Sequence, residues 1–223
     1  MLVDIGTNGE IALWHRGQLS CCSTAAGPAF EGAGLSMGMA GKTGAVDHVR
    51  VQDGALQAHV IGGGAPKGIC GSGVIDALAC LVELEQLDET GLLEQDPAPV
   101  APPVCLTQKD VRMVQLAKSA ICAGLSTLLR VEGLCGADAA ELAVAGGFGS
   151  YLDVDSAGRI GLLPEELVPR VRVLGNAALS GAAMLLLNRG FIPRSEALAA
   201  GARTVDLSTS AEFMNAYTEG MFF

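Results

Sequence analysis

Residues 1–10, MLVDIGTNGE, place an aspartate at the end of a short apolar segment and directly before a glycine-rich turn. Gly6 and Gly9 have no Cβ, so we expect the turn to adopt positive φ and to let a phosphate approach its backbone N–H groups. Thr7 and Asn8 would add side-chain hydrogen-bond donors to that phosphate. The same residues contain Asn-Gly, a common turn signal, so a plain β-hairpin remains the alternative interpretation.

Asp4 and a second glycine-rich run carry the rest of the expected nucleotide chemistry. Asp4 could hold a magnesium ion through water, because Mg²⁺ keeps several waters and takes only one or two carboxylates. The run AGGFG, which ends at Gly149, follows an expected buried strand and precedes an expected helix. The bare backbone of Gly146 and Gly147 could lie flat against adenine and ribose, with Phe148 packed beneath. A tight strand-to-helix turn is the alternative.

Other polar groups each allow two interpretations. The segment 68–73, GICGSG, opens a helix whose N-terminus would attract an anion, but glycine and serine also cap helices for structural reasons. Cys70 could be a reactive thiol, although a small residue in a tight turn is the preferred interpretation. Glu31, Asp76 and Lys118 could be functional groups, yet charged residues in or near helices usually stay solvated, and we expect this of them.

Several motifs resemble those of a known superfamily. This is the superfamily of acetate and sugar kinases, heat-shock chaperones and actin. DIGTNGE from Asp4 resembles its second phosphate motif, AGGFG to Gly149 its adenosine motif, and GNAALSGA from Gly175 its second connecting motif. The intervening segments are similar to a narrower group, the C-terminal domain of reductive activators of corrinoid proteins, in CSTAAGPAFEGA from Cys22, GICGSGVID from Gly68, TQKDVR from Thr107 and QLAK from Gln115. The resemblance extends over nearly the whole chain.

This resemblance implies the ATP-dependent reduction of an inactive cob(II) corrinoid protein to cob(I). Asp4 would organise Mg²⁺ and water, residues 6–9 would hold the phosphates, Gly146 and Gly147 would hold the nucleoside, and Glu10 would orient water. The implied partner is a corrinoid protein or a corrinoid-dependent methyltransferase. The electron would come from a [2Fe–2S] cluster in an N-terminal domain of the parent protein, not from this chain.

The same resemblance predicts the domain content. Residues 1–223 are expected to be the C-terminal half of an actin-like ATPase domain, without the iron–sulfur domain and the first ATPase half that precede it in the family. A small-molecule kinase of the same superfamily would need the same phosphate and adenosine elements. A non-catalytic docking module or homodimerisation module is a further alternative, favoured by abundant Ala, Leu and thiol groups.

Composition and charge argue against several other classes. The 223 residues are 50% hydrophobic but only 4% aromatic, which is typical of a soluble globular chain with a core of small aliphatic side chains. The net charge of −10 argues against nucleic acid or an anionic membrane as a partner. We expect a cytoplasmic protein, because neither a leader nor a membrane-spanning run is recognisable. The 7 cysteines show no iron–sulfur spacing and are expected to be reduced thiols.

The pattern of apolar residues predicts an α/β fold, a ribonuclease-H-like (actin-like ATPase) half-domain with the element order βββαβαβα. Three antiparallel strands are expected over 1–6, 9–15 and 18–25. Thr107 and Asp110 form a capping-box-like start to a helix that runs to about Val131. The remaining expected elements are a strand over 141–145, a helix over 154–160, a strand over 171–174 and a helix over 176–188.

An inserted subdomain is expected between the third strand and the long helix, over residues 26–106. Its expected parts are a hairpin of strands 46–51 and 56–61, a flexible Gly-Gly-Gly at 62–64, a helix over 72–86 and a proline-rich loop over 96–103.

Overall fold

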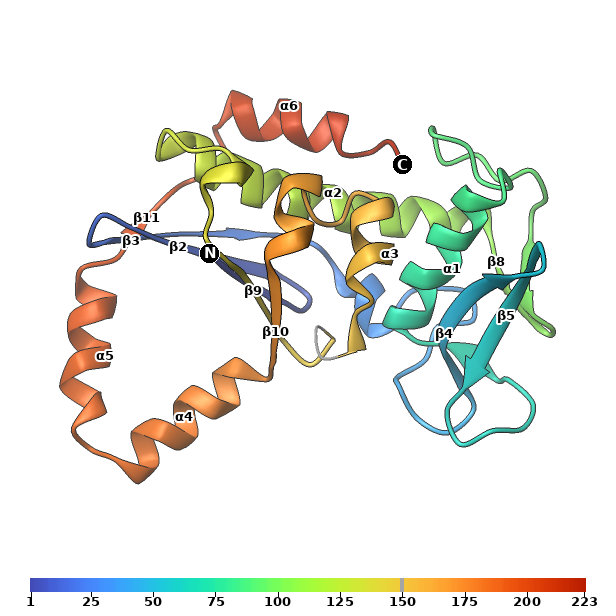
Figure 1. The fold of residues 1–223 in the computed structure, drawn as a ribbon, viewed down its shortest axis with the longest axis horizontal. Helices are drawn as coiled ribbons and strands as arrows, with labels where there is room; N and C mark the ends of the chain where they lie inside the picture. Colours follow the sequence, from blue (N-terminus) through green and yellow to red (C-terminus); the bar gives the residue numbers. More distant parts are fainter. Residues whose placement is uncertain (149–150) are drawn as a thin grey trace.

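A computed structural model describes residues 1–148 and 151–223, so the expected nucleotide contact of Gly149 lies outside the described residues. The chain has a mixed α/β fold around a six-stranded sheet with the strand order β10-β9-β1-β2-β3-β11 (Figure 1). The strands of this sheet are β1 Leu2–Ile5, β2 Gly9–His15, β3 Gln18–Thr24, β9 Leu142–Ala145, β10 Val171–Gly175 and β11 Arg203–Thr204.

The first three strands form an antiparallel meander, and β9 and β10 extend the sheet in parallel beyond β1. β2 and β3 are joined by Arg16 and Gly17, with φ of 49° and 81°, as a two-residue hairpin turn requires. The predicted strands 1–6, 9–15 and 18–25 therefore agree with β1, β2 and β3 to within about a residue at each end. β11 pairs in parallel with β3 and was not predicted.

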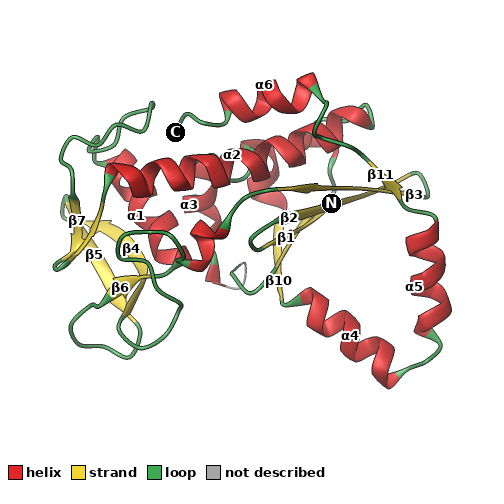
Figure 2. Cartoon of the chain, turned by 180° about the vertical axis from the view of Figure 1, so that it is seen from behind, coloured by secondary structure: helices red, strands yellow, loops and turns green. Residues whose placement is uncertain are grey.

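Helix α2 (Gln108–Val131) covers one face of the sheet (Figure 2). It begins with the predicted capping box, in which the Thr107 side chain accepts from the Asp110 N–H and the Asp110 side chain accepts from the Thr107 N–H. A Cβ added to Gly124 would lie 2.6 Å from Ile11 Cδ1, so a glycine at this position brings the helix close to β2. Because the capping signal is local, the sequence was sufficient to place the start of this helix.

The expectation of positive φ at Gly6 and Gly9 is wrong, since neither has a left-handed backbone conformation. Gly9 is the first residue of β2, and a Cβ on it would lie 2.2 Å from Ile121 Cδ1 of α2. Its lack of a side chain is therefore required by packing of the helix on the sheet. The tip of the hairpin consists of residues 6–8, where the Gly6 N–H donates to the Asn8 carbonyl at 2.9 Å.

Helix α6 (Ala211–Glu219) lies along the outer side of α2, and Lys118 fixes its end. Lys118 is completely buried, and its Nζ donates to the Gly220 carbonyl at 2.7 Å and to the Phe222 carbonyl. Burial lowers the pKa of Lys118 to about 8. The expectation that Lys118 stays solvated is wrong, because the backbone carbonyls after α6 replace water around the ammonium group.

Between β3 and α2 the chain forms a second, smaller layer of elements. These are the 3₁₀ helix η1 Pro28–Glu31, strands β4 Ala45–Gln52, β5 Ala55–Val60 and β6 Gly68–Ile69, helix α1 Gly71–Glu83, and the hairpin of β7 Ala98–Ala101 with β8 Val104–Leu106. β4 and β5 form the predicted antiparallel hairpin.

The prediction of a proline-rich loop over 96–103 is wrong for residues 98–101, which form the strand β7. This strand pairs only with β8, so Pro99 lies on an edge strand, where the missing N–H is tolerated. Ala98 and Val100 are buried at 3% and 5% exposure, and this burial keeps the segment extended.

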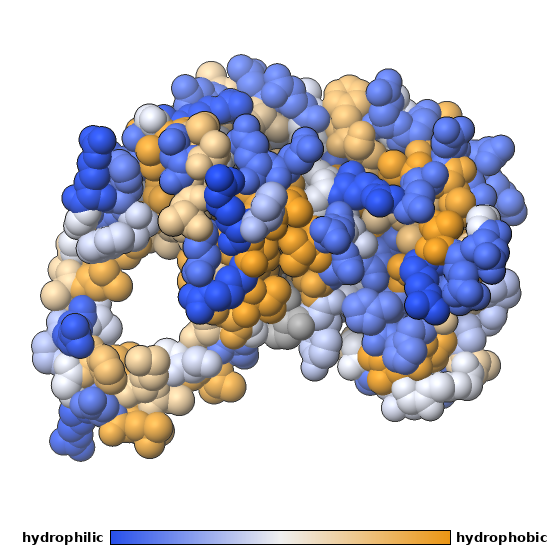
Figure 3. Space-filling view, viewed as in Figure 1, coloured by the Kyte–Doolittle hydropathy of each residue, from blue (hydrophilic) through white to orange (hydrophobic). Residues whose placement is uncertain are grey.

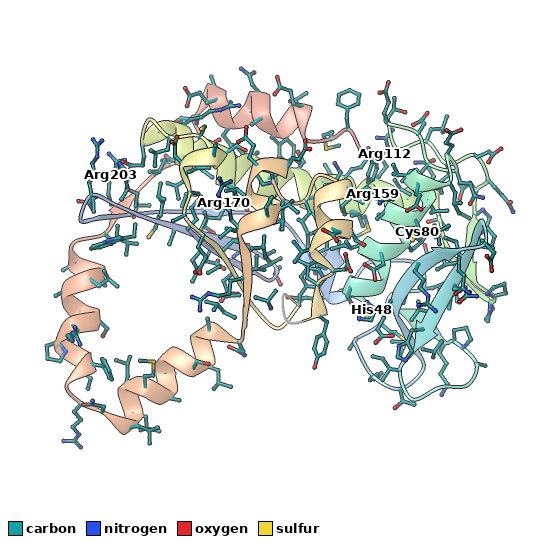
Figure 4. All side chains as sticks on the ribbon, in the orientation of Figure 1. His48, Cys80, Arg112, Arg159, Arg170 and Arg203 are labelled. Atoms are coloured by element: carbon teal, nitrogen blue, oxygen red, sulfur yellow. The ribbon has the colours of Figure 1, made fainter. Side chains whose placement is uncertain are left out.

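Further helices follow α2 in the chain. They are the 3₁₀ helices η2 Gly136–Asp138 and η4 Glu165–Arg170, and the α-helices α3 Val154–Arg159, α4 Ala177–Leu187 and α5 Phe191–Ala200. α3 and α4 occur where helices were predicted. Arg159 at the end of α3, labelled in Figure 4, forms a salt bridge with Glu83 at the end of α1.

Helices α4 and α5 form an arm, residues 177–200, that extends away from the sheet. Neither helix contains a buried residue, and Leu186 and Leu187 are 84% and 85% exposed. Figure 3 shows apolar side chains on this arm and an opening between it and the rest of the molecule. In the part of the chain that the structure describes, no helix combines the length and the apolar character needed to cross a bilayer.

Candidate functional site

A cleft of about 430 Å³ lies where the carboxyl end of β1 approaches η1, the start of α1 and the loop after β9. Its walls include Asp4 and Gly6 from β1 and its turn, Glu31 from η1, Ser72 from α1, and Phe148 from the loop after β9. Residues as far apart in the sequence as Asp4 and Tyr151 therefore meet in one cleft. Binding sites in α/β folds are commonly found at the carboxyl ends of parallel strands, where loops from neighbouring strands converge.

The phosphate and nucleoside motifs are brought together by the parallel pairing of β1 with β9. Asp4 stands opposite Ala145 in this register, so Gly146 follows directly beside it. Gly146 has a φ of 101°, and a Cβ on it would lie 2.5 Å from the Ile5 carbonyl oxygen and 2.8 Å from Asp4 Oδ1. Gly146 therefore allows the loop to turn tightly against Asp4.

Gly147 and Phe148 contribute a bare backbone and an aromatic surface to the cleft. Gly147 is exposed, and a Cβ added to it would meet open space. Phe148 stacks on the buried ring of Phe30, with ring centroids 5.2 Å apart and planes inclined by 16°. An exposed glycine backbone next to a stacked aromatic pair is a surface on which a flat nucleoside could lie.

The N-terminus of α1 also faces this cleft, through Gly71 and Ser72. A Cβ on Gly71 would lie 1.8 Å from the Phe30 carbonyl oxygen, so the glycine is needed for close packing. The Ser72 hydroxyl donates to the Asp47 carbonyl at 2.8 Å and Cys70 is buried, which supports the structural interpretation of these two residues. The free N–H groups of a helix start nevertheless give this wall a positive partial charge.

Asp76 holds α1 in position from behind the cleft. It is 3% exposed, its Oδ2 lies 2.9 Å from His48 Nδ1, and it accepts from the Val49 N–H at 3.3 Å. Figure 4 labels His48 near the lower end of α1. Burial raises the pKa of Asp76, and hydrogen bonds from His48 act in the opposite direction. The expectation that Asp76 stays solvated is wrong, because His48 and Val49 of β4 supply hydrogen-bond partners in place of water.

The structure does not bring Glu10 into the cleft. Glu10 stands directly opposite Asp4 in the β1–β2 pairing and is exposed, with the Ser23 hydroxyl 3.5 Å from its Oε1. Among the described residues that line the cleft, neither Glu10 nor Asn8 is included. Thr7 is also absent from the lining, and its hydroxyl donates to Glu31 Oε1 at 3.0 Å. That proton is therefore unavailable to a phosphate.

Glu31 lines the cleft, although the sequence favoured a solvated residue without a function at this position. It is exposed, as expected, and it belongs to the segment AGPAFEG that carried the family resemblance. Its contact with Thr7 spans 24 residues and depends on how η1 packs. A carboxylate that follows a buried aromatic residue in a glycine-flanked segment was the only signal that could have indicated it.

The residues of the cleft fit a magnesium–nucleotide complex. In the described part of the chain, no group of three or more His, Cys, Asp or Glu side chains is arranged to hold a metal ion. Mg²⁺ needs no such cage, since it is usually held by one or two carboxylates, water and substrate phosphates. Asp4 and Glu31 offer two carboxylates on the walls of one cleft, which matches this requirement.

Residues 1–223 match the family described as the C-terminal domain of RACo, the ASKHA domain. The chain belongs to this family. The superfamily motifs meet in the cleft through Asp4 and Gly147, which is consistent with the assignment, and the resemblance inferred from the sequence is confirmed.

Two relatives and one solved structure are similar to most or all of this chain. The corrinoid activation enzyme RamQ of Eubacterium limosum is 38% identical over 252 residues, covering 100% of this chain and 42% of the relative. The [Co(II) methylated amine-specific corrinoid protein] reductase of Methanosarcina barkeri is 30% identical over 211 residues, covering 85% and 39%. A solved reductive activator for corrinoid, iron–sulfur protein superimposes with a TM-score of 0.90 at 32% identity, covering 100% of this chain and 39% of that one. The chain therefore spans less than half the length of these relatives.

Proposed function

We propose that this chain is the nucleotide-binding, C-terminal half of the actin-like ATPase domain of an ATP-dependent reductive activator, which returns cob(II) corrinoid proteins to cob(I). The observation that carries the proposal is the cleft in which Asp4, Gly6, Gly147 and Phe148 meet. The relatives are described as activators or reductases of corrinoid proteins, which supports the choice of this reaction over other reactions of the superfamily.

The residues of the cleft divide the work on the nucleotide. Gly147 and Phe148 would hold adenine and ribose, and Gly6, at the start of the turn after β1, would face the phosphates. Asp4 would hold Mg²⁺ through its waters and orient them beside the terminal phosphate. Bound Mg²⁺ would neutralise charge on the phosphates and lower the barrier to their hydrolysis.

The electron in this proposal enters from outside the chain. Reducing cob(II) to cob(I) takes one electron, and we assign its delivery to a [2Fe–2S] domain in the part of the protein that the relatives have beyond this half. Closing of the cleft around ATP would change how the protein holds its corrinoid partner and so favour the reduced state. The partner would be a corrinoid protein, either free or as part of a methyltransferase system.

The test of nucleotide chemistry is the substitution Asp4→Asn in the full-length protein. Asparagine keeps the size of the side chain but loses the charge that holds the magnesium shell, so ATP hydrolysis should fall about 100-fold or more while the melting temperature stays within a few degrees. ATPase rate and thermal unfolding are measured side by side. A well-folded variant with unchanged hydrolysis would remove Asp4 from the mechanism.

A further inference from the structure

The carboxylate of Glu31 lies against the turn between β1 and β2. Its Oε1 accepts a hydrogen bond from Thr7 Oγ1 at 3.0 Å, and a Cβ added to Gly6 would lie 3.8 Å from the same oxygen. Glu31 and Asp4 therefore face one cleft from two elements, η1 and β1, on either side of the glycine turn.

The backbone that carries Glu31 is fixed by close packing, although the carboxylate itself is exposed. Phe30 is 2% exposed, and its ring stacks on Phe148. Gly32, with a φ of 76°, is so close to Met39 that a Cβ would lie 2.5 Å from the Met39 carbonyl oxygen. A charged group on such a rigid segment is already oriented before a ligand binds, which lowers the entropic cost of using it.

The charge in the cleft is unusual for a site that would take a polyphosphate. Asp4 and Glu31 are both acidic, and among the described residues that line the cleft none is Lys, Arg or His. Two carboxylates repel a bare triphosphate, and the N-terminus of α1 offers only a partial positive charge. A divalent cation held between the carboxylates and the phosphates would reverse this repulsion.

We propose that Glu31 is the second carboxylate of the magnesium–phosphate site, acting with Asp4, and that Thr7 is the residue that positions it. Glu10, which the family resemblance implied would orient water, lies outside the cleft. The inference rests on the proposed function, because it concerns the same nucleotide site. It adds that the site binds ATP more tightly as its complex with a divalent cation than as the bare triphosphate.

The experiment compares two ligands, Mg-ATP and ATP in excess chelator, by calorimetry on the full-length protein. Glu31→Gln keeps an acceptor for Thr7 but removes the charge. We expect it to weaken Mg-ATP binding about 10-fold or more, as loss of a supporting group around a metal does. The same variant should bind metal-free ATP as well as the wild type or better, because one repelling charge is gone. Glu212→Gln, on α6 beyond α2, should change neither affinity.

The opposite signs separate a metal-site role from a structural one. If Glu31 only braces the turn, Glu31→Gln will weaken both ligands alike or affect neither, and the inference is overturned. Thr7→Val leaves the charge but removes its hydrogen bond, so it should weaken Mg-ATP selectively and by a smaller factor than Glu31→Gln. Should the wild-type protein bind neither ligand, the proposed function fails together with the inference.

Discussion

At the scale of single residues, the glycines of the cleft serve two different purposes. Gly9 and Gly71 are glycines because a helix or a carbonyl group occupies the space of a side chain. Gly146 combines a positive φ with contacts to Asp4 and Ile5, whereas Gly147 has open space in front of it. Packing thus explains Gly9, Gly71 and Gly146, of which only Gly71 lines the cleft, whereas Gly147 and Gly6 present a bare backbone to it.

This distinction predicts opposite results for two neighbouring substitutions. Gly146→Ala should lower the free energy of unfolding by roughly 2–4 kcal/mol, since it adds left-handed strain and a contact within the van der Waals distance of Ile5. Gly147→Ala meets no atom and should leave stability within about 0.5 kcal/mol. Urea unfolding of both variants measures this, and equal stabilities would contradict the packing that we describe.

The sequence was informative about residues whose role depends on a local pattern. Asp4, Gly147 and Phe148 were predicted because strand ends and glycine runs can be recognised within a few residues. Glu31 could not be predicted as part of the site, because its position depends on the packing of Phe30 against Phe148. Glu10 was given a role from its place in the motif. It lies on the same sheet face as its partner Asp4, but on β2, one strand further from β9, and it does not line the cleft.

At the scale of elements, the long helix α2 connects the sheet to the C-terminal residues. Its inner side packs on β2 and β3, and its outer side holds α6 through Lys118 and Ser119. The start of α2 was predictable from its capping box. β11 has only two residues and pairs with β3, more than 180 positions earlier, so no local signal indicates it. The Ser210 cap of α6 is a local signal, yet α6 was not predicted.

Burial of Lys118 predicts a pH dependence of stability. Its pKa is lowered from 10.5 to about 8 in the folded chain, mainly by burial, with Cys122 acting weakly in the opposite direction. Between pH 8 and pH 10.5, Lys118 holds its proton in the unfolded chain but loses it in the folded chain, so the free energy of unfolding rises with pH. Above about pH 9 the buried thiols of Cys22 and Cys80 lower the stability as the pH rises, because burial raises their pKa values to about 12 and 11 and the unfolded chain loses these protons first.

The window for this measurement is therefore pH 8 to 9. Over that interval Lys118 should raise the free energy of unfolding of the wild type by up to about 1 kcal/mol, and Lys118→Met should abolish this contribution. Lys109→Met, at an exposed position of the same helix, should keep the rise. Urea unfolding at several pH values tests both, and identical profiles for the wild type and Lys118→Met would show that Lys118 does not titrate as described.

At the scale of the whole molecule, the α4–α5 arm and the length of the chain relative to its relatives stand out. It covers 42% and 39% of the lengths of its relatives. The α4–α5 arm consists of two helices of 11 and 10 residues without a buried side chain, and isolated helices of this length are marginally stable in water. The predicted helix 176–188 was therefore located from its pattern, but what its apolar residues pack against could not be read from the sequence.

The central claim is that nucleotide in this cleft drives reduction of a corrinoid partner, and the cobalt absorbance of that partner tests it most directly. The full-length protein is mixed with a corrinoid protein in the cob(II) state and an electron donor, with and without Mg-ATP. We predict cob(I) formation only with Mg-ATP, and its loss in the Asp4→Asn variant. The same yield of cob(I) without nucleotide would contradict the account, and phosphorylation of a small acid or sugar instead would favour a kinase of the same superfamily.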